Sequence, residues 1–139
     1  MSTMTGTVRT FTRAQAIESR TLIEADPGIA AEVEFPAPVA MTEAVYADCI
    51  AVPEAYTWDT GIRLDDAERE WDLLSTASRA IKAAAGTGRP PRLAFALYRI
   101  PVDGRSRDPQ RVTLVAEASP GDDGERVITI MRPGEHLPQ

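Results

Sequence analysis

The apolar residues of the first 85 positions recur at helical spacing, interrupted by residues that start or stop helices. A helix over 12–20 begins with Thr12 and Gln15 at capping-box spacing, so that each side chain can satisfy the backbone N–H of the other residue. A short helix over 27–33 begins with an Asp-Pro pair, a common start because proline tolerates the first helical position. The pattern therefore predicts two short helices before residue 35.

Two further helices follow, and the second is the longest that the pattern predicts. Thr42 is the N-cap of a helix over 43–52. Asp65 begins a helix over 65–85, in which Asp65 and Arg69 have the spacing of an ion pair on one helix face. We expect the apolar stripe of this helix to hold Ala67, Trp71, Leu74, Ser78, Ile81 and Ala85, widened by Leu73, Ala77, Ala80 and Ala84.

The period changes from helix to strand after residue 91. Residues 92–100, 111–117 and 126–132 are apolar enough for strands, and polar turn-forming residues separate them. Two adjacent turns favour an antiparallel meander. The predicted core holds Trp71, Leu74, Ile81, Leu93, Phe95, Leu97, Leu114, Ile128 and Ile130.

These elements predict an α+β fold, with three to four N-terminal helices packed on a C-terminal three-stranded antiparallel sheet. The 139 residues fit a single domain, 1–139, in which we expect 1–10 and 134–139 to be loose. Residues 21–24 and 35–38 are expected to be extended connections, and 53–63 a loop.

Composition excludes several classes of protein. Hydrophobic residues make up 43 % and charged residues 26 %, as in ordinary globular proteins, and no apolar run is long enough to span a bilayer. One cysteine and one histidine exclude a disulfide framework and a Cys/His zinc site within one chain. We therefore expect no cofactor or metal, and a free cysteine without a targeting signal indicates a cytoplasmic protein.

The net charge of -6 is unevenly distributed. Residues 1–60 hold nine acidic and three basic residues, a balance of -6, whereas residues 61–139 are neutral. This charge argues against direct nucleic-acid binding and favours a partner protein with a basic surface. Tyr56 and Trp58 fit either an interface or a cover over the sheet. The candidate partner-binding residues are Glu32, Glu34, Glu43, Asp48, Glu54, Tyr56, Trp58 and Asp59.

Arginines gather around the predicted strands and suggest a second chemistry. Arg99, Arg126 and Arg132 are candidates for anion binding, and in a small ribonuclease-like toxin they would stabilise phosphate. An alternative interpretation of the same arginines is that charged strand ends discourage edge-to-edge aggregation of the sheet.

No catalytic set accompanies these arginines. His136 lies near the chain end, Cys49 lies on an apolar helix stripe, and the acidic run 122–125 fits a tight turn better than a cation site. We assign no catalytic residue, and the composition favours a protein that is not an enzyme.

Several strings resemble an uncharacterised family of small proteins from bacterial plasmids, phages and integrative elements. The strings are TRAQAIE at 12–18, TEAVYADCIA at 42–51, WDLL at 71–74, RVTLVAEASPGDDGE at 111–125 and VITIMRPGE at 127–135. The resemblance implies a mobile-element accessory protein. By analogy with anti-CRISPR and anti-restriction inhibitors, it implies that the acidic surface blocks a nucleic-acid-binding site of a host defence protein. A homodimer stays open, because an exposed sheet edge or aromatic loop often pairs.

Overall fold

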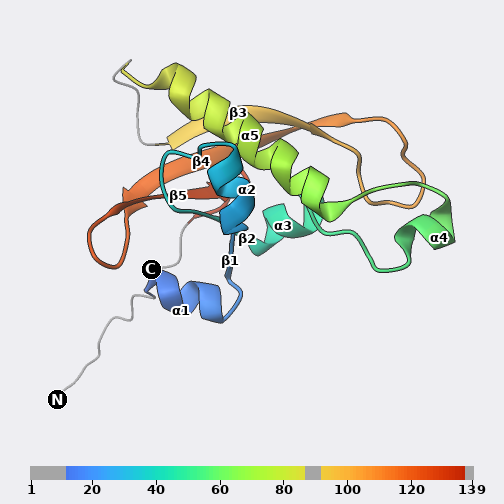
Figure 1. Ribbon diagram of the computed structural model, residues 1–139, viewed down its shortest axis with the longest axis horizontal. Coiled ribbons are helices and arrows are strands. Elements are labelled where there is room, and N and C mark those ends of the chain that lie inside the picture. Colours follow the sequence, from blue (N-terminus) through green and yellow to red (C-terminus); the bar gives the residue numbers. More distant parts are fainter. Residues whose placement is uncertain (1–11, 87–91, 137–139) are drawn as a thin grey trace.

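The computed structural model describes residues 12–86 and 92–136, which form an α+β fold (Figure 1). The predicted fold class is confirmed at this level, while the details of sheet and helix packing differ from the prediction. In chain order the described elements are α1 (Arg13–Glu18), β1 (Leu22–Glu24), α2 (Pro27–Glu32), β2 (Val39–Thr42), α3 (Glu43–Cys49), α4 (Tyr56–Thr60), α5 (Asp66–Ala84), β3 (Arg92–Arg99), β4 (Gln110–Pro120) and β5 (Arg126–Met131).

The sheet has five strands in the order β1-β2-β5-β4-β3. The three predicted strands form the expected antiparallel meander β3-β4-β5. The prediction of a purely antiparallel three-stranded sheet is wrong, because β2 pairs parallel with β5 and β1 pairs antiparallel with β2. All four residues of β2 are buried, so this strand lacks the alternation by which a strand is recognised in a sequence.

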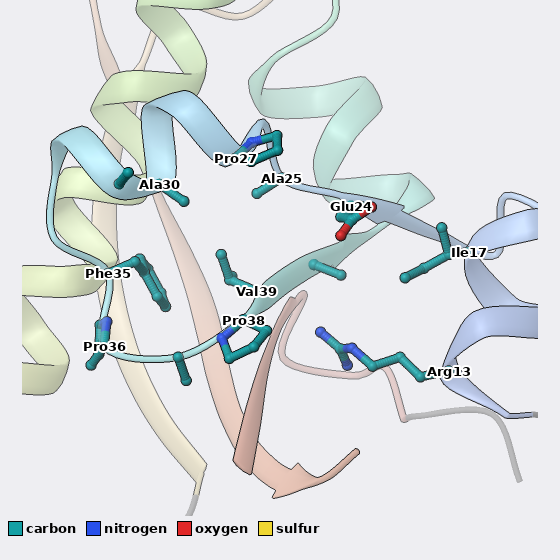
Figure 2. A pocket seen from close by; sticks show the side chains of 13 residues that line it. Arg13, Ile17, Glu24, Ala25, Pro27, Ala30, Phe35, Pro36, Pro38 and Val39 are labelled. Carbon is teal, nitrogen blue, oxygen red and sulfur yellow. The ribbon is translucent and has the colours of Figure 1, made fainter. Parts of the chain in front are cut away.

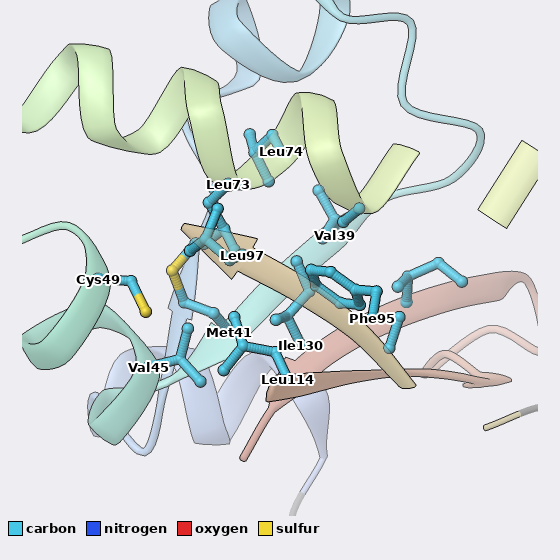
Figure 3. Packing of buried hydrophobic residues seen from close by; sticks show 14 of the residues in the cluster. Val39, Met41, Val45, Cys49, Leu73, Leu74, Phe95, Leu97, Leu114 and Ile130 are labelled. Carbon is cyan, nitrogen blue, oxygen red and sulfur yellow. The ribbon is translucent and has the colours of Figure 1, made fainter. Parts of the chain in front are cut away.

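Helices cover both faces of the sheet, and most of the core lies on one of them. Residues of α3 and α5 pack with Met41, Phe95, Leu114 and Ile130 of the strands in the main core (Figure 3). On the opposite face Ala16 of α1 packs against strand residues that alternate with the core-facing ones. The sequence predicted helices packed on the sheet without assigning a face to each one, and the structure places α1 on the opposite face from α5.

The acidic turn between β4 and β5 holds α1 in place. The Asp122 carboxylate accepts hydrogen bonds from the backbone N–H groups of Arg13 at 2.7 Å and Ala14 at 3.0 Å. The Arg13 guanidinium donates to Thr129 Oγ1 at 2.8 Å and to the Ile128 carbonyl at 2.9 Å. These contacts lock the first turn of α1 against β5 and give the Asp122 carboxylate a structural role.

The predicted helix starts are confirmed. The capping box at Thr12 is formed, and the side chains of Asp26, Thr42 and Asp65 accept backbone N–H groups of α2, α3 and α5. Two predicted segments differ. The helix expected over 43–52 ends at Cys49, and the segment expected to be a loop over 53–63 contains α4.

The buried face of α5 is rotated from the predicted stripe. Leu73, Leu74 and Ala77 are fully buried, whereas Trp71, a predicted core residue, is 43 % exposed. The predicted ion pair of Asp65 with Arg69 is also wrong, because Arg69 is 7 % exposed and points inward. Its guanidinium donates to three carbonyl oxygens, those of Asp48 (3.2 Å), Ile50 (3.2 Å) and Ile100 (2.8 Å). Arg69 thereby joins the end of α3 to the end of β3.

Candidate protein-binding surface

The acidic residues predicted to bind a partner do not share one surface. Glu34 lies after α2, where its carboxylate is 4.0 Å from the Lys82 ammonium. Glu43 begins α3 and lines a separate cleft, and the Asp48 carboxylate is bound by the Arg99 guanidinium at 3.0 Å. Glu32 is exposed at the end of α2. Glu54, Trp58 and Asp59 are exposed and close together along the chain, with Glu54 just before α4 and the other two within it.

We call residues 51–64 the α4 arm, because they lead away from the sheet and carry α4 at the end of the molecule (Figure 1). The Tyr56 side chain is buried, and its hydroxyl accepts the backbone N–H of Gly104 at 2.9 Å. The Thr60 hydroxyl donates to the Tyr56 carbonyl at 2.7 Å and accepts the N–H of Ile62 at 3.0 Å. The hydrogen bond between Tyr56 and Gly104 thus fixes the α4 arm to the loop between β3 and β4, while the two bonds of Thr60 order the arm itself.

Trp58 is the most exposed large hydrophobic residue in the described part of the chain, at 90 %. Tyr56, two residues earlier, faces inward and holds the arm. The two aromatic residues that the sequence grouped therefore have different roles in the structure. An exposed tryptophan on a fixed helix has the chemistry of an interface hot spot, because it offers a large apolar area with little side-chain entropy to lose.

A small cleft of about 190 Å³ lies at the base of the α4 arm. Asp65, the N-cap of α5, and Glu68 and Asp72 in its first turns line this cleft together with Leu97 and Tyr98 of β3. Arg63 and Arg99 also line it, and the buried Arg99 Nε has no hydrogen-bond partner. We call this space the base cleft.

The base cleft adds Asp65, which the sequence analysis assigned to the start of a helix, and Glu68 and Asp72, to which it gave no binding role. A signal was present, because residues 54–72 hold seven acidic and two basic residues, a balance of -5. That stretch crosses residue 60, where the sequence analysis divided the chain, and the division concealed it.

The three candidate anion-binding arginines are far apart. Arg99 at the end of β3 is bound to Asp48 and to the Gln110 carbonyl. Arg126 begins β5 and Arg132 follows its end, so about 20 Å of strand separates them at 3.3 Å per residue. The structure does not bring these arginines to one phosphate position.

Cys49 and His136 also lie in different surroundings. Cys49 packs in the main core, where burial and the neighbouring Asp48 carboxylate raise the pKa of its thiol to about 12 (Figure 3). His136 is exposed and lines the cleft beside Thr42 and Glu43. Glu135, in the segment expected to be loose, accepts a hydrogen bond from the Thr42 hydroxyl at 2.8 Å. The segments 1–10 and 137–139 lie outside the described residues.

A third cleft, of about 440 Å³, opens between α1 and α2 (Figure 2). Its lining is mostly apolar and includes Ile17, Phe35 and Pro38, with Arg13 and Glu24 as its charged residues. Burial lowers the pKa of Arg13, and the nearby carboxylates of Asp122, Glu125 and Glu24 partly offset this effect. Since the Arg13 guanidinium is already bound to β5, the cleft can accept an apolar side chain but offers no free cation for an anion.

Comparisons with known proteins add no assignment to this geometry. The chain matches no family model, no curated protein and no solved structure. Across residues 12–86 and 92–136, none of the helices combines the length and apolarity needed to cross a bilayer. Those same residues contain no group of three His, Cys, Asp or Glu side chains placed to hold a metal ion.

Proposed function

We propose that the protein is a binding protein without enzymatic activity, and that the α4 arm and the base cleft engage a basic surface of another protein. The observation that carries this proposal is Trp58, 90 % exposed on a helix that Tyr56 fixes to the neighbouring loop. A side chain of this size exposes apolar area that water solvates poorly, and burial against a partner would release that water.

Charge supports a basic partner. Glu54 and Asp59 flank Trp58, and Asp65, Glu68 and Asp72 line the base cleft nearby along the chain. Carboxylates around an aromatic anchor speed association with a positively charged surface and disfavour acidic partners. Association should therefore slow as ionic strength rises, because salt screens exposed charges beyond about 10 Å at 0.1 M.

The kind of partner follows from the resemblance to mobile-element proteins. We propose that the partner is a nucleic-acid-binding protein of the host, and that the acidic surface occupies the site where it binds a phosphate backbone. The protein would then act as a counter-defence inhibitor of the anti-CRISPR kind in the cytoplasm. Nucleic acid would compete with it for the partner, since both would bind the same basic surface.

Affinity capture from lysate of the native host tests this proposal, with Trp58→Ala compared with Trp71→Ala. Trp71 is a matched control, because it is a partly exposed tryptophan on α5 that does not line the base cleft. We expect the wild type and Trp71→Ala to retain a basic protein at low salt that elutes as salt rises, and Trp58→Ala to lose most of it. Equal recovery by both variants, or recovery of no basic protein at any salt, would contradict the proposal.

A further inference from the structure

The free edge of β3 is a second interaction surface, which runs from Arg92 to the border of the base cleft at Tyr98 and Arg99. We propose that it pairs antiparallel with β3 of a second copy of this chain, joining two five-stranded sheets across a two-fold axis at Ala96. This inference goes beyond the proposed function, because it concerns a second copy of the chain and does not need Trp58, although Tyr98 at one end of the edge also lines the base cleft.

The β3 edge is long and regular. β3 is the last strand of the sheet, and its eight residues pair with β4 in unbroken register from Arg92 with Glu117 to Arg99 with Gln110. No bulge or proline interrupts it. The other edge strand, β1, has three residues. An open strand of this length is a template for pairing, and proteins usually protect such edges.

The two charged residues of β3 do not protect the edge, because their own chain binds them. The Arg92 guanidinium is paired with the Glu117 carboxylate and also donates to the Pro133 and Glu135 carbonyls at 3.2 Å. Arg99 is paired with Asp48. Between these two residues β3 carries no charge, so nothing along it would repel an identical strand.

A two-fold axis at Ala96 would place side chains of complementary size opposite each other. In an antiparallel pair related by two-fold symmetry, directly opposite residues lie on the same face of the sheet. Ala94 and Tyr98 would then lie opposite each other twice, once on each side of the axis. Tyr98 is 61 % exposed and Ala94 is also exposed, so each tyrosine ring would cover the small side chain of the other copy. On the opposite face Phe95 would meet Leu97 and continue the row of core residues.

The helix above the edge leaves room for the second copy. α5 contacts β3, and Arg69 at its first turns reaches the Ile100 carbonyl just beyond the strand. One flank of α5 faces α2, where Glu70 accepts the Asp26 N–H at 2.7 Å. The other flank carries the base-cleft carboxylates of Glu68 and Asp72 in its first turns and then Thr76 and Ala80, which are small, uncharged and half-buried. Two copies of α5 would face each other across these small residues.

The oligomeric state of the full chain tests this inference. We expect light scattering after size exclusion to give twice the monomer mass at high micromolar concentration and a lower average mass on dilution. Ala96→Lys would place two like charges opposite each other at the axis and should give monomers. Ala47→Lys, an exposed position on α3, should leave the dimer intact, and so should Trp58→Ala. A wild type that is monomeric throughout, or identical behaviour of the two lysine variants, would overturn the inference.

A cross-linking experiment keeps the test decisive if Ala96→Lys fails to fold. The axis would bring Ala96 and its copy to a Cα separation of about 4.5–5.5 Å, within the range of a disulfide. With diamide as oxidant, Ala96→Cys should form a covalent dimer quickly and Ala47→Cys should not, while Cys49 stays buried in both. Equal cross-linking at the two positions would also overturn the inference. Loss of partner capture in a Trp58→Ala protein that still dimerises would show that Trp58 serves partner binding and is not needed for the dimer.

Discussion

Arg69 is the single residue whose structural role differs most from its sequence context. It sits in the charged first part of α5, where a surface ion pair with Asp65 is expected. The structure instead buries the guanidinium against the carbonyls of Asp48, Ile50 and Ile100. Burial lowers the pKa of Arg69, and the planar fork of donors suits three carbonyls better than an ammonium would.

Replacing Arg69 with methionine tests this role. The change keeps much of the side-chain volume but leaves the three carbonyls without their donor, and we expect the free energy of unfolding to fall by about 2–4 kcal/mol. Urea denaturation measures it. Arg79→Met, on the exposed side of α5, should change stability by less than about 0.5 kcal/mol. Equal losses in the two variants would mean that the carbonyl contacts contribute nothing specific.

Cys49 yields a prediction about pH and reactivity. Its thiol has a pKa of about 12 in the folded protein against 9.0 for an ordinary thiol, chiefly because it is buried. The unfolded chain therefore releases this proton first, and the stability that the buried thiol contributes is full below pH 9 and is lost toward pH 12. Iodoacetamide at pH 8 should label Cys49 slowly in the native protein and rapidly in urea. Equally fast labelling in both states would contradict the burial of the thiol.

At the same scale, the sequence predicts residues whose role is local. The N-caps at Thr12, Asp26, Thr42 and Asp65 need only neighbouring residues, and all four are confirmed. The burial of Arg69 and the exposure of Trp71 depend on which elements lie across from α5, and hydrophobicity along one helix does not contain that information.

The attachment of α1 is a property of two elements, α1 and the turn between β4 and β5. Backbone N–H groups of Arg13 and Ala14 lower the pKa of Asp122. A carboxylate with a lowered pKa stabilises the folded state above its unfolded pKa, and that contribution is lost as the pH falls through the acidic range.

Asp122→Ala should therefore release α1 while leaving the main core folded. We expect the amides of α1 to exchange hydrogen faster, and those of α5 to be unchanged, when exchange is followed by NMR or mass spectrometry. Asp123→Ala is the matched control, since its carboxylate receives neither the Arg13 nor the Ala14 N–H. Unchanged exchange in α1 of Asp122→Ala would refute this anchoring role.

The α4 arm makes a similar prediction about pre-organisation. Tyr56→Phe keeps the buried ring but removes the acceptor for the Gly104 N–H, a bond worth about 1 kcal/mol. We expect faster exchange at Gly104 and weaker partner binding than wild type, with a smaller loss than in Trp58→Ala. Partner binding by Tyr56→Phe at full wild-type strength would show that the fixed position of the arm is unimportant.

Predictability at the scale of elements depends on length and on burial of one face. The long helix and the three C-terminal strands carry clear periodicity and were predicted with nearly correct bounds. β1 has three residues, and β2 is covered by α1 on one side and by α3 and α5 on the other. Neither strand shows an alternating pattern, and the parallel pairing of β2 with β5 joins residues almost 90 positions apart.

At the scale of the whole molecule, the structure shows which of the predicted partner-binding residues share one accessible surface. The net charge predicts an acidic binding protein. The fold, however, distributes the candidate residues over three regions. Chain folding determines which of them stay accessible, because Asp48 is bound by Arg99 and Tyr56 is buried. What remains on the α4 arm is Trp58 with Glu54 and Asp59, joined by the carboxylates of the base cleft.

Site-specific photo-cross-linking in the native host tests the central claim most directly. A benzophenone amino acid replaces Trp58 in one variant and Trp71 in another, and the cells are irradiated. We predict a covalent product from position 58 that contains a basic, nucleic-acid-binding protein, and little or no such product from position 71. A product of equal yield from both positions, or none from position 58, would contradict the claim that the α4 arm is the partner-binding surface.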